Sequence, residues 1–256
     1  MFTVRTPRVV AARRLHRRRD RDETGRFLAE GPQAVREALR TGVVTELFAT
    51  AEAARRYPEL AQDASLVDDG AMQALADTMQ PQGLVAVCRQ RDVPLATVLS
   101  GGPRLIAVCV DIRDPGNAGT VLRTADAAGA TAVIFAGDAV DPYNGKAVRS
   151  SAGSLFHVSV VRARDTAATI AALRASGVQV LAADGYGDSD LFDLDEALSL
   201  PTAWLFGSEA HGLPKDLDAD RRVRVPLYGG AESLNLAAAA AVCLYSSAKA
   251  MTRGID

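Results

Sequence analysis

Leu205-Phe206-Gly207-Ser208-Glu209-Ala210-His211-Gly212-Leu213-Pro214 joins an apolar run, residues 203–206, to a carboxylate flanked by glycines. The run is one of six short apolar segments that alternate with helical stretches after residue 104. Strands that are apolar on both faces and separated by helices indicate a mostly parallel sheet covered on both sides. The sequence therefore predicts an α/β domain whose ligand site lies beyond the carboxyl ends of its strands. The expected strands are 105–110, 132–135, 158–161, 178–182, 203–206 and 223–225, and the expected helices are 119–128, 146–151, 165–175 and 235–251.

A second, smaller α/β domain is expected ahead of this sheet. Short helices and strands alternate there, and residues 89–104 then carry breakers, among them Pro94 and Ser100-Gly101-Gly102-Pro103. We expect the boundary near Gly101, which divides the chain into domains 1–100 and 101–256. The expected elements of the small domain are helices at 31–41, 51–57 and 71–76 and strands at 44–49, 65–67 and 84–88.

The composition is that of a globular protein, with 48% apolar and 23% charged residues in 256. No apolar run approaches the roughly 20 residues needed to span a bilayer, and the N-terminus lacks the apolar core and cleavage site of a targeting peptide. We therefore expect a cytoplasmic protein with no membrane role. Cys88, Cys109 and Cys243 lie far apart in apolar runs, which favours buried free thiols. No His/Cys spacing resembles a zinc site, so no metal is expected.

The N-terminus is basic although the formal net charge is −2. Arginine suits phosphate because its guanidinium is forked and permanently charged. The cluster is therefore consistent with an RNA-binding arm or with a solvated, partly mobile arm. Its members, which face only Asp20 in the same stretch, are Arg5, Arg8, Arg13, Arg14, Arg17, Arg18, Arg19 and Arg21.

Two further segments carry polar residues at expected strand ends. Asp111-Ile112-Arg113-Asp114-Pro115-Gly116-Asn117-Ala118-Gly119 forms a turn that leads into a helix. Asn117 can cap that helix, and Arg123 on its second turn can reach back over the loop or remain solvated. The other segment runs from Val223-Arg224-Val225-Pro226-Leu227 to Ser233-Leu234-Asn235, with Ser233 as a reasonable helix N-cap. Glycine fingerprints of dinucleotide sites and P-loops are absent.

Together the three segments resemble the signature motifs of the SpoU/TrmH-like RNA 2′-O-methyltransferases of the SPOUT superfamily. The motifs are N-x-G-x-x-x-R after D-P-G, G-x-E-x-x-G, and an apolar-Pro-apolar strand end leading to S-L-N, and they occur in the family's order. The chain is similar to the thiostrepton-resistance rRNA methyltransferases within this family. Gly25-Arg26-Phe27-Leu28-Ala29-Glu30-Gly31 followed by a helix is similar to the family's L30e-like substrate-binding domain. The resemblance implies a deep trefoil knot in the C-terminal domain, S-adenosylmethionine as cofactor, and a structured RNA substrate, with ribosomal favoured over transfer RNA.

The resemblance also implies roles for individual residues. Arg123 would grip the phosphate beside the target ribose and stabilise the developing alkoxide, either in its own subunit or across a dimer. Asn117 and Glu209 would orient Arg123 or the ribose, while Ser233 and Asn235 would hold the loop around the cofactor. A branched side chain at Gly207 is expected to collide with the cofactor. Many relatives have serine where this chain has Ala237. The implied cofactor-binding residues are Phe206, Gly207, Val225, Leu227 and Leu234.

A homodimer is expected through the helix at 235–251, which is apolar on every face. Relatives dimerise through this helix and the knot region. A charge at Ala240 would split the dimer if Ala240 faces the partner and unfold the domain if it faces the core. Two alternatives to an enzyme remain open: a non-catalytic RNA-binding protein that keeps the knotted fold, and a scaffold for oligomers or ribosome assembly that acts through its basic arm.

Overall fold

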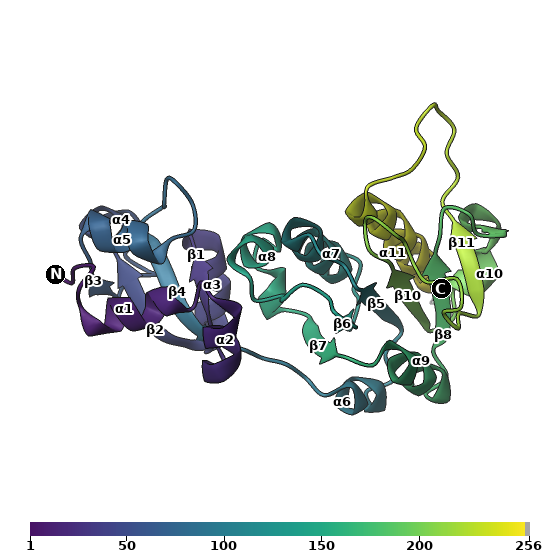
Figure 1. Cartoon of the computed structure of the whole chain (residues 1–256), viewed down its shortest axis with the longest axis horizontal. Helices are drawn as coiled ribbons and strands as arrows, with labels where there is room; N and C mark the ends of the chain where they lie inside the picture. The colour runs from purple at the N-terminus through teal and green to yellow at the C-terminus, as the bar shows by residue number, and fades with distance from the viewer. Residues whose placement is uncertain (254–256) are drawn as a thin grey trace. The chain divides into compact units, whose positions relative to one another are not determined.

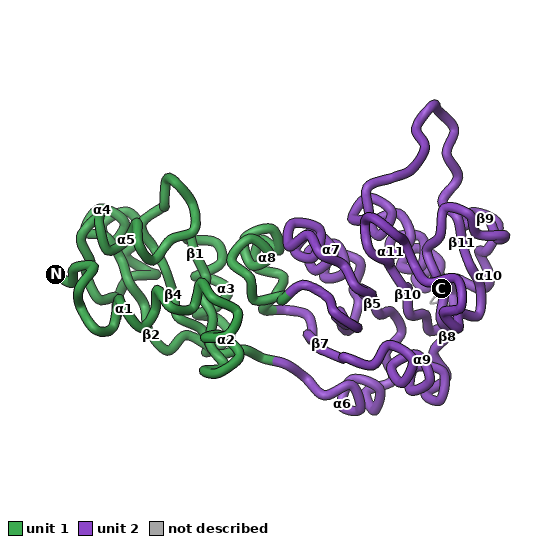
Figure 2. Tube along the Cα trace, viewed as in Figure 1, with its two compact units in different colours: residues 1–91, 141–156 green, residues 92–140, 157–256 purple. Residues whose placement is uncertain are grey.

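The computed structural model describes residues 1–253, and contacts divide the chain into two compact units. Unit 1 comprises Met1–Arg91 and Asp141–Phe156, while unit 2 comprises Asp92–Val140 and the chain from His157 onward (Figure 2). Two differences from the expected domains stand out. The boundary lies at residues 91 and 92 rather than near Gly101, and a segment from the middle of the chain returns to unit 1.

Unit 1 is built on a four-stranded sheet in the order β1-β4-β2-β3 (Figure 1). Strand β4 (Leu84–Arg89) is antiparallel to β1 (Arg26–Glu30) and to β2 (Val44–Ala49), and β3 (Ser65–Leu66) is parallel to β2. This arrangement confirms the expected small α/β domain. Its helices are α1 (Pro7–Arg14), α2 (Arg18–Thr24), α3 (Pro32–Arg40), α4 (Ala51–Arg56), α5 (Asp69–Leu75) and α8 (Gly145–Ser150).

Most of the N-terminal arginines lie on folded helices, so the alternative of a partly mobile arm is wrong. Val9, Ala12 and Leu15 of this segment pack in the core of unit 1, which holds α1 against α5. Several of the arginines are ion-paired within the unit, which reduces the positive charge available to a polyanion. The pairs are Arg8 with Glu46, Arg14 with Asp20, Arg18 with Asp22 and Arg19 with Glu23.

Arg21 is a structural residue and not a phosphate ligand. Its side chain is only 3% exposed, and its Nε donates to Oδ2 of Asp141 at 2.7 Å. Nη1 of Arg21 donates to the carbonyls of Leu15 and His16 at 2.9 and 3.0 Å, and Asp141 accepts from the backbone N of Tyr143. Burying two charges costs free energy unless each is paired and fully hydrogen-bonded, and this network meets that condition.

The segment 141–156 carries a helix that we expected in the C-terminal domain. Its helix α8 packs instead against β1, and Phe27 of β1 contacts Tyr143 and Phe156 with ring centroids 4.8 and 6.0 Å apart. Aromatic rings bury a large apolar area, so these contacts retain the segment in unit 1. Sequence position alone assigned the helix to the wrong unit because its partners lie more than 100 residues upstream.

Unit 2 contains a seven-stranded sheet in the order β7-β6-β5-β10-β8-β11-β9, and every pairing in it is parallel. The predicted parallel sheet is therefore confirmed. The trefoil knot stays a prediction of the resemblance. The strands are β5 (Leu105–Val110), β6 (Ala132–Ala136), β7 (Ser159–Ala163), β8 (Gln179–Ala183), β9 (Ser189–Asp190), β10 (Thr202–Phe206) and β11 (Arg221–Arg224). The helices are α6 (Leu95–Ser100), α7 (Pro115–Ala127), α9 (Thr166–Ala175), α10 (Asp195–Leu198) and α11 (Leu236–Arg253).

Helix α6 explains why the boundary precedes Gly101. We expected residues 89–104 to form a linker, but Val98 of α6 is buried in the core of unit 2. The backbone N of Val93 donates to the carbonyl of Val160, and Asp92 pairs with Arg162. The breaker residues therefore end a short helix that already belongs to unit 2.

Helix α11 has one fully buried stripe and one partly exposed face. It packs mainly on α7, and Nε1 of Trp204 in β10 donates to Oγ of Ser247 at 2.9 Å in the core. Ala240 is 0% exposed, so of the two outcomes expected for a charge there, the core position is the one observed. The buried stripe consists of Ala237, Ala240, Cys243, Leu244, Ser247 and Met251.

The three cysteines are free and buried, as expected. Burial raises the pKa of Cys88 and Cys243 to about 12, because a thiolate is poorly solvated in an apolar core. These thiols are therefore protonated and unreactive at neutral pH. Within residues 1–253, no helix is both long and apolar enough to cross a membrane.

The buried Arg21–Asp141 pair predicts a large stability effect. Arg21→Met leaves Asp141 buried without its counter-charge, so the free energy of unfolding should fall by about 3–5 kcal/mol. Arg18→Met removes a pair that is about half exposed and should change it by less than about 1 kcal/mol. Urea denaturation followed by circular dichroism compares the two variants. Equal losses would show that the buried pair does not hold unit 1 together.

Candidate functional site

Strand β10 brings three strand ends to one edge of the sheet. Its last residue, Phe206, is in register with Cys109 of β5 on one side and with Ala183 of β8 on the other. The strands are parallel, so the loops that follow all three begin side by side. These loops are the segments at 111–117, 207–212 and 184–187.

The loop after β5 is held in an uncommon backbone conformation. Asp111 has φ of +52°, a region that non-glycine residues seldom adopt. Its Oδ1 accepts a hydrogen bond from the backbone N of Asp138 at 2.7 Å. A Cβ on Gly137 would lie 2.4 Å from that same oxygen, so glycine is required at this position. The loop after β6 thus anchors the start of the motif after β5.

Helix α7 begins earlier than the sequence pattern indicates. Asp114 is its N-cap and accepts from the backbone N of Asn117 at 2.9 Å, and Pro115 is the first helical residue. Asn117 therefore lies in the first turn and does not cap the helix. Arg123 is the ninth residue of α7 and lies two turns in, not one.

Glu209 joins the first two motifs. Its carboxylate accepts hydrogen bonds from Nδ2 of Asn117 at 2.9 Å and from the backbone N of Arg113 and Asp114 at 3.2 and 3.3 Å. The third motif completes the network, because Nδ2 of Asn235 donates to Oδ1 of Asn117 at 3.3 Å. One chain of hydrogen bonds therefore links residues that are 118 positions apart in the sequence.

Asn235 also caps helix α11. Its Oδ1 accepts from the backbone N of Ala237 at 2.9 Å and of Ala238 at 3.4 Å. The expected cap, Ser233, is exposed and precedes the helix by three residues. The side chain of Asn235 thus fixes the start of α11 and orients Asn117 at the same time.

The environment of Glu209 favours its ionised form. Burial raises the pKa of this carboxyl, but the hydrogen bonds from Asn117 and from backbone N–H groups, including those of Arg113 and Asp114, outweigh it and lower the pKa. The contribution of the carboxylate to loop order is therefore present at neutral pH. It is lost only as the pH falls through this lowered pKa.

Gly207 is required by the protein backbone itself. A Cβ at this position would lie 2.2 Å from the carbonyl carbon of Gly212 and 2.4 Å from the backbone N of Leu213. Gly212 has φ of +64°, and it exchanges two backbone hydrogen bonds with Ser208. The collision expected for a branched side chain at Gly207 is thus with the returning loop, so such a variant would not test cofactor binding specifically.

A cleft of about 800 Å³ opens beside these loops within unit 2. Its size lies within the range of small-molecule sites. All five residues assigned to cofactor binding line it, namely Phe206, Gly207, Val225, Leu227 and Leu234. Glu209, Ser233 and Asn235 line it as well, whereas Asn117 and Arg123 do not.

The cleft combines apolar side chains with carboxylates. Leu227 and Leu234 line the cleft and are 41% and 39% exposed, so both present apolar surface to it. Carboxylates on the lining come from Asp184, Asp190 and Glu232 as well as Glu209. Such a lining fits a ligand with a flat heterocycle and a positive charge, and S-adenosylmethionine has adenine together with sulfonium and ammonium groups.

Sequence reasoning missed the part of the cleft that follows β8. Ala183, Asp184 and Gly185 line it, and Asp184 accepts from Nη1 of Arg222 at 2.8 Å. The available signal was the run Asp184-Gly185-Tyr186-Gly187 directly after an apolar strand, which has the same form as the recognised motifs. Three or more His, Cys, Asp or Glu side chains grouped to hold a metal ion do not occur within residues 1–253.

Arg123 stands apart from the hydrogen-bond network. Its side chain is exposed on α7, and in the described part of the chain it makes no hydrogen bond or ion pair. Its guanidinium is therefore available to an external anion. The structure brings together every other predicted site residue at or beside the cleft.

The Asn117–Glu209 hydrogen bond predicts a measurable shift in titration. Asn117→Ala removes a donor to the carboxylate, so the pKa of Glu209 should rise above its value in the parent protein. Carbon-13 NMR of the labelled carboxyl groups follows the titration directly. Asn144→Ala removes a helix cap in unit 1 and serves as the control. If the titration midpoint of Glu209 is unchanged in Asn117→Ala, the hydrogen bond from Asn117 to Glu209 does not hold the carboxylate.

Comparison with known proteins agrees with this geometry. The profile of the SpoU rRNA Methylase family matches residues 104–245, and that of the MRM3-like substrate binding domain matches residues 6–86. The 23S rRNA (guanosine(2553)-2′-O)-methyltransferase RlmP of Bacillus subtilis is 36% identical over 239 residues, which cover 91% of this chain and 92% of that protein.

Solved structures show the same similarity. An AdoMet-bound rRNA methyltransferase from Sinorhizobium meliloti superimposes with a TM-score of 0.85 at 33% identity, covering 97% of both chains. The SpoU methyltransferase AviRb from Streptomyces viridochromogenes, in complex with AdoMet, gives 0.82 at 30% identity and covers 98% of this chain and all of its own. The expected fold class, methyltransferase activity and S-adenosylmethionine cofactor are thereby confirmed. The chain belongs to the SpoU rRNA methylase family.

Proposed function

We propose that this protein methylates a ribose 2′-hydroxyl of ribosomal RNA, with S-adenosylmethionine bound in the cleft of unit 2. The observation that carries the proposal is the hydrogen-bond chain Glu209–Asn117–Asn235, which ties all three motifs to the edge of that cleft. The rRNA methyltransferases among its relatives support the choice of substrate. A cytoplasmic location follows from a ribosomal substrate and remains a prediction.

The proposed cofactor residues divide between backbone and apolar contacts. Phe206 ends β10 at the cleft and Gly207 follows it, and Val225, Leu227 and Leu234 line the cleft as well. When bound, the cofactor supplies an electrophilic methyl group on its sulfonium, so the protein has to place the hydroxyl and exclude competing geometries. The leucines would cover the heterocycle, and the nearby carboxylates would favour the cationic end.

Arg123 is the proposed catalytic residue because its charge is free and its helix is fixed. Guanidinium retains its proton at neutral pH, so its role is electrostatic and positional. It would bind the phosphate next to the target ribose and favour oxyanion character at the 2′-hydroxyl. Asn117 in the first turn of the same helix ties that helix to Glu209, which makes both of them positioning residues for Arg123.

Ser233 and Asn235 are proposed to hold the loop before α11. Asn235 caps the helix and bonds to Asn117, so its side chain sets the end of the loop. Ser233 lines the cleft two residues earlier. Ala237 is buried at the first turn of α11 and has no hydroxyl, so no hydroxyl-dependent role is proposed at that position.

Unit 1 is proposed to bind the RNA. It carries the match to a substrate binding domain, and three of its N-terminal arginines, Arg5, Arg13 and Arg17, are exposed and lie outside the ion pairs described above. Arginines in this setting contact phosphate without reading sequence. The affinity they supply should fall with added salt, because each neutralised phosphate releases a counterion.

We propose that the protein forms a homodimer through the face of α11 that lies opposite its buried stripe. Ala238 and Tyr245 are exposed there, Tyr245 by 53%, and Ala241 and Val242 are only partly covered. Small side chains beside one aromatic ring allow close approach of a second helix in an isologous contact. Arg123 would then act in its own subunit or across the dimer.

The function is tested by mapping ribose methylation in ribosomal RNA from cells with and without the protein. One position should lose its methyl group in the deletion strain and regain it with the parent gene. Arg123→Ala should keep its affinity for S-adenosylmethionine but lose at least about 10²-fold in methyl transfer in vitro, as when one oxyanion stabiliser is removed. Near-normal turnover would overturn the assignment of Arg123.

A second variant, Leu234→Ser, tests cofactor binding separately from methyl transfer. Leu234→Ser removes apolar surface from the cleft and should weaken S-adenosylmethionine binding about tenfold in titration calorimetry, since burying one leucine contributes roughly 1.5–3 kcal/mol. Leu200→Ser changes a leucine that is 54% exposed away from the cleft and should bind normally. A ribosomal methylation map that the deletion leaves unchanged would instead favour the non-catalytic RNA-binding alternative.

The dimer is tested by placing a charge on the exposed face of α11. Tyr245→Glu should give a monomer in light scattering at micromolar concentration, because a carboxylate would be buried against its symmetry mate. Met79→Glu, at a side chain that is 92% exposed in unit 1, is the control. A dimeric Tyr245→Glu protein would place the interface elsewhere, and a fully active monomer would remove the dimer from the mechanism.

A further inference from the structure

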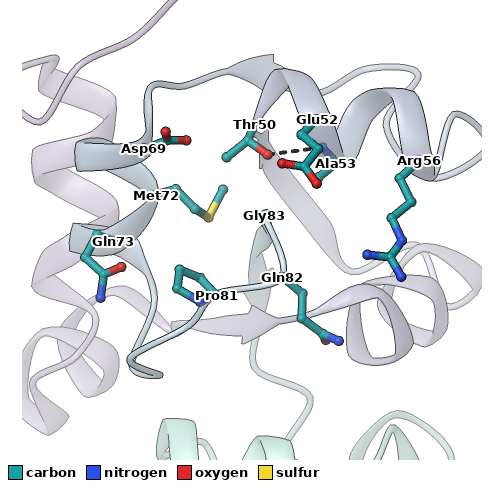
Figure 3. Close-up of a pocket in the computed structure, with 10 residues that line it drawn as sticks. All are labelled: Thr50, Glu52, Ala53, Arg56, Asp69, Met72, Gln73, Pro81, Gln82 and Gly83. Atoms are coloured by element: carbon teal, nitrogen blue, oxygen red, sulfur yellow. Dashed lines mark hydrogen bonds between the residues drawn. The ribbon is translucent and has the colours of Figure 1, made fainter.

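A second cleft, of about 300 Å³, is formed entirely by residues of unit 1. Helix α4, helix α5 and the loop that joins α5 to β4 supply its walls (Figure 3). None of the proposed catalytic or cofactor residues takes part in it. Its lining residues are Thr50, Glu52, Ala53, Arg56, Asp69, Met72, Gln73, Pro81, Gln82 and Gly83.

The floor of this cleft is apolar and rigidly placed. Met72 is 1% exposed and Ala53 is 4% exposed, and Figure 3 shows Pro81 and Gly83 next to the Met72 side chain. Gly83 has φ of +79°, and a Cβ there would lie 2.6 Å from Oγ1 of Thr50 and 2.7 Å from Cβ of Ala53. The loop is therefore pressed onto α4, and the cleft is a built feature of the domain.

The rim is polar and carries groups free to bind a ligand. In Figure 3, Glu52, Arg56 and Gln82 lie on one side of the floor, and Asp69 and Gln73 lie on the other. The side chains of all five are exposed. The carboxylates of Glu52 and Asp69 make no ion pair or hydrogen bond within the described part of the chain, so they can accept hydrogen bonds from a ligand.

We propose that this cleft binds one unstacked guanine of the RNA substrate and so contributes to the choice of target. The proposal rests on the function proposed above, because it takes RNA as the substrate. Proteins read single-stranded RNA by accommodating splayed-out bases and bonding to their Watson–Crick edges. A cleft at the small end of the range for ligand sites fits a single base, and the partly exposed Pro81 ring, next to the buried Met72 side chain, offers it an apolar surface.

The rim selects among the four bases through its donors and acceptors. Guanine presents two adjacent donors, N1–H and the 2-amino group, which a single carboxylate such as Glu52 accepts together, and its O6 accepts from an amide such as Gln82. Adenine and cytosine each place a ring-nitrogen acceptor beside their amino group, and that acceptor would face the carboxylate. Uracil has one donor between two acceptors. Guanine is therefore the base that this rim complements.

The charge on the rim argues against a phosphate site. Two free carboxylates, Glu52 and Asp69, outweigh the single guanidinium of Arg56. A dianionic phosphate inside the cleft would be repelled by that balance, whereas a neutral base with outward-facing donors is not, and the phosphate of a bound nucleotide would lie outside the carboxylates, beside Arg56. Arg56 stacks near the ring of Tyr57, 5.4 Å from its centroid, and can contact the nucleotide from the edge of the cleft.

Methionine-methyl NMR of the full-length protein tests the proposal directly. The chain has four methionines, Met1, Met72, Met79 and Met251, of which Met72 forms the floor and Met251 is buried in unit 2. Titration with guanosine monophosphate should shift the Met72 methyl resonance through the ring current of the base and leave Met251 unchanged. The monophosphates of adenosine, cytidine and uridine should bind about tenfold more weakly, as expected for loss of a bidentate base contact.

Paired variants give matched controls for two side chains on the rim, Glu52 and Arg56. Glu52→Gln and Arg56→Gln should weaken guanosine monophosphate binding, Glu52→Gln by about tenfold. Glu59→Gln and Arg55→Gln change exposed residues of the same unit outside the cleft and should bind as the parent does. No Met72 shift, or equal affinity for all four nucleotides, would overturn the proposal. The readout requires neither cofactor nor methyl transfer, so its failure with ribosomal methylation intact would leave the proposed function standing.

Discussion

The parallel pairing of β10 with β5 and β8 is the constraint on which the site depends. Because Phe206 is in register with Cys109 and Ala183, the loops that carry the motifs leave the sheet at one edge. A slip of two residues in either pairing would move Glu209 by about 7 Å along the strand direction. Its carboxylate would then lose the three donors that hold it, and the link from Asn117 to Asn235 would have no anchor.

Two glycines at this edge of the sheet, Gly207 of the second motif and Gly137 of the loop after β6, are required by the backbone itself. Gly207 allows the loop after β10 to pass against Gly212, and Gly137 makes room for the carboxylate of Asp111. These close approaches turn the loops back over the sheet edge. Glu209 is presented to Asn117 as a result, so the pattern G-x-E-x-x-G describes a folded loop with one carboxylate at its tip. The apolar lining of the cleft comes from a different stretch, residues 225–234.

Charge in this chain is arranged locally, which the total of −2 conceals. Arg21 is buried and neutralised by Asp141, and other N-terminal arginines pair with acids of the same unit. Buried ion pairs require full hydrogen bonding, and the carbonyls of Leu15 and His16 supply it. The same pair holds residues 141–156 in unit 1, so the chain passes three times between the two units. A domain of this kind is continuous in space and discontinuous in sequence.

Local pattern was sufficient for much of the architecture. Apolar runs identified strands such as Leu105–Val110 and Thr202–Phe206 to within a residue, because strands buried on both faces need apolar side chains at every position. The order of the three motifs indicated the family. The motifs also indicated residues of the cleft between Phe206 and Leu234, because the loops that follow parallel strands of one sheet leave it at the same edge.

Tertiary structure decided the remainder. The helical N-terminus, the docking of α8 on β1 and the capping role of Asn235 depend on partners distant in sequence, which a local pattern does not contain. The reason that Gly207 is glycine depends likewise on the backbone of Gly212, five residues further along a loop whose fold no periodicity specifies. The sequence by itself determined which strands form and in what order the motifs occur. Only the packed structure determined which polar atoms meet, because hydrogen bonds form between atoms close in space and not between positions in a pattern.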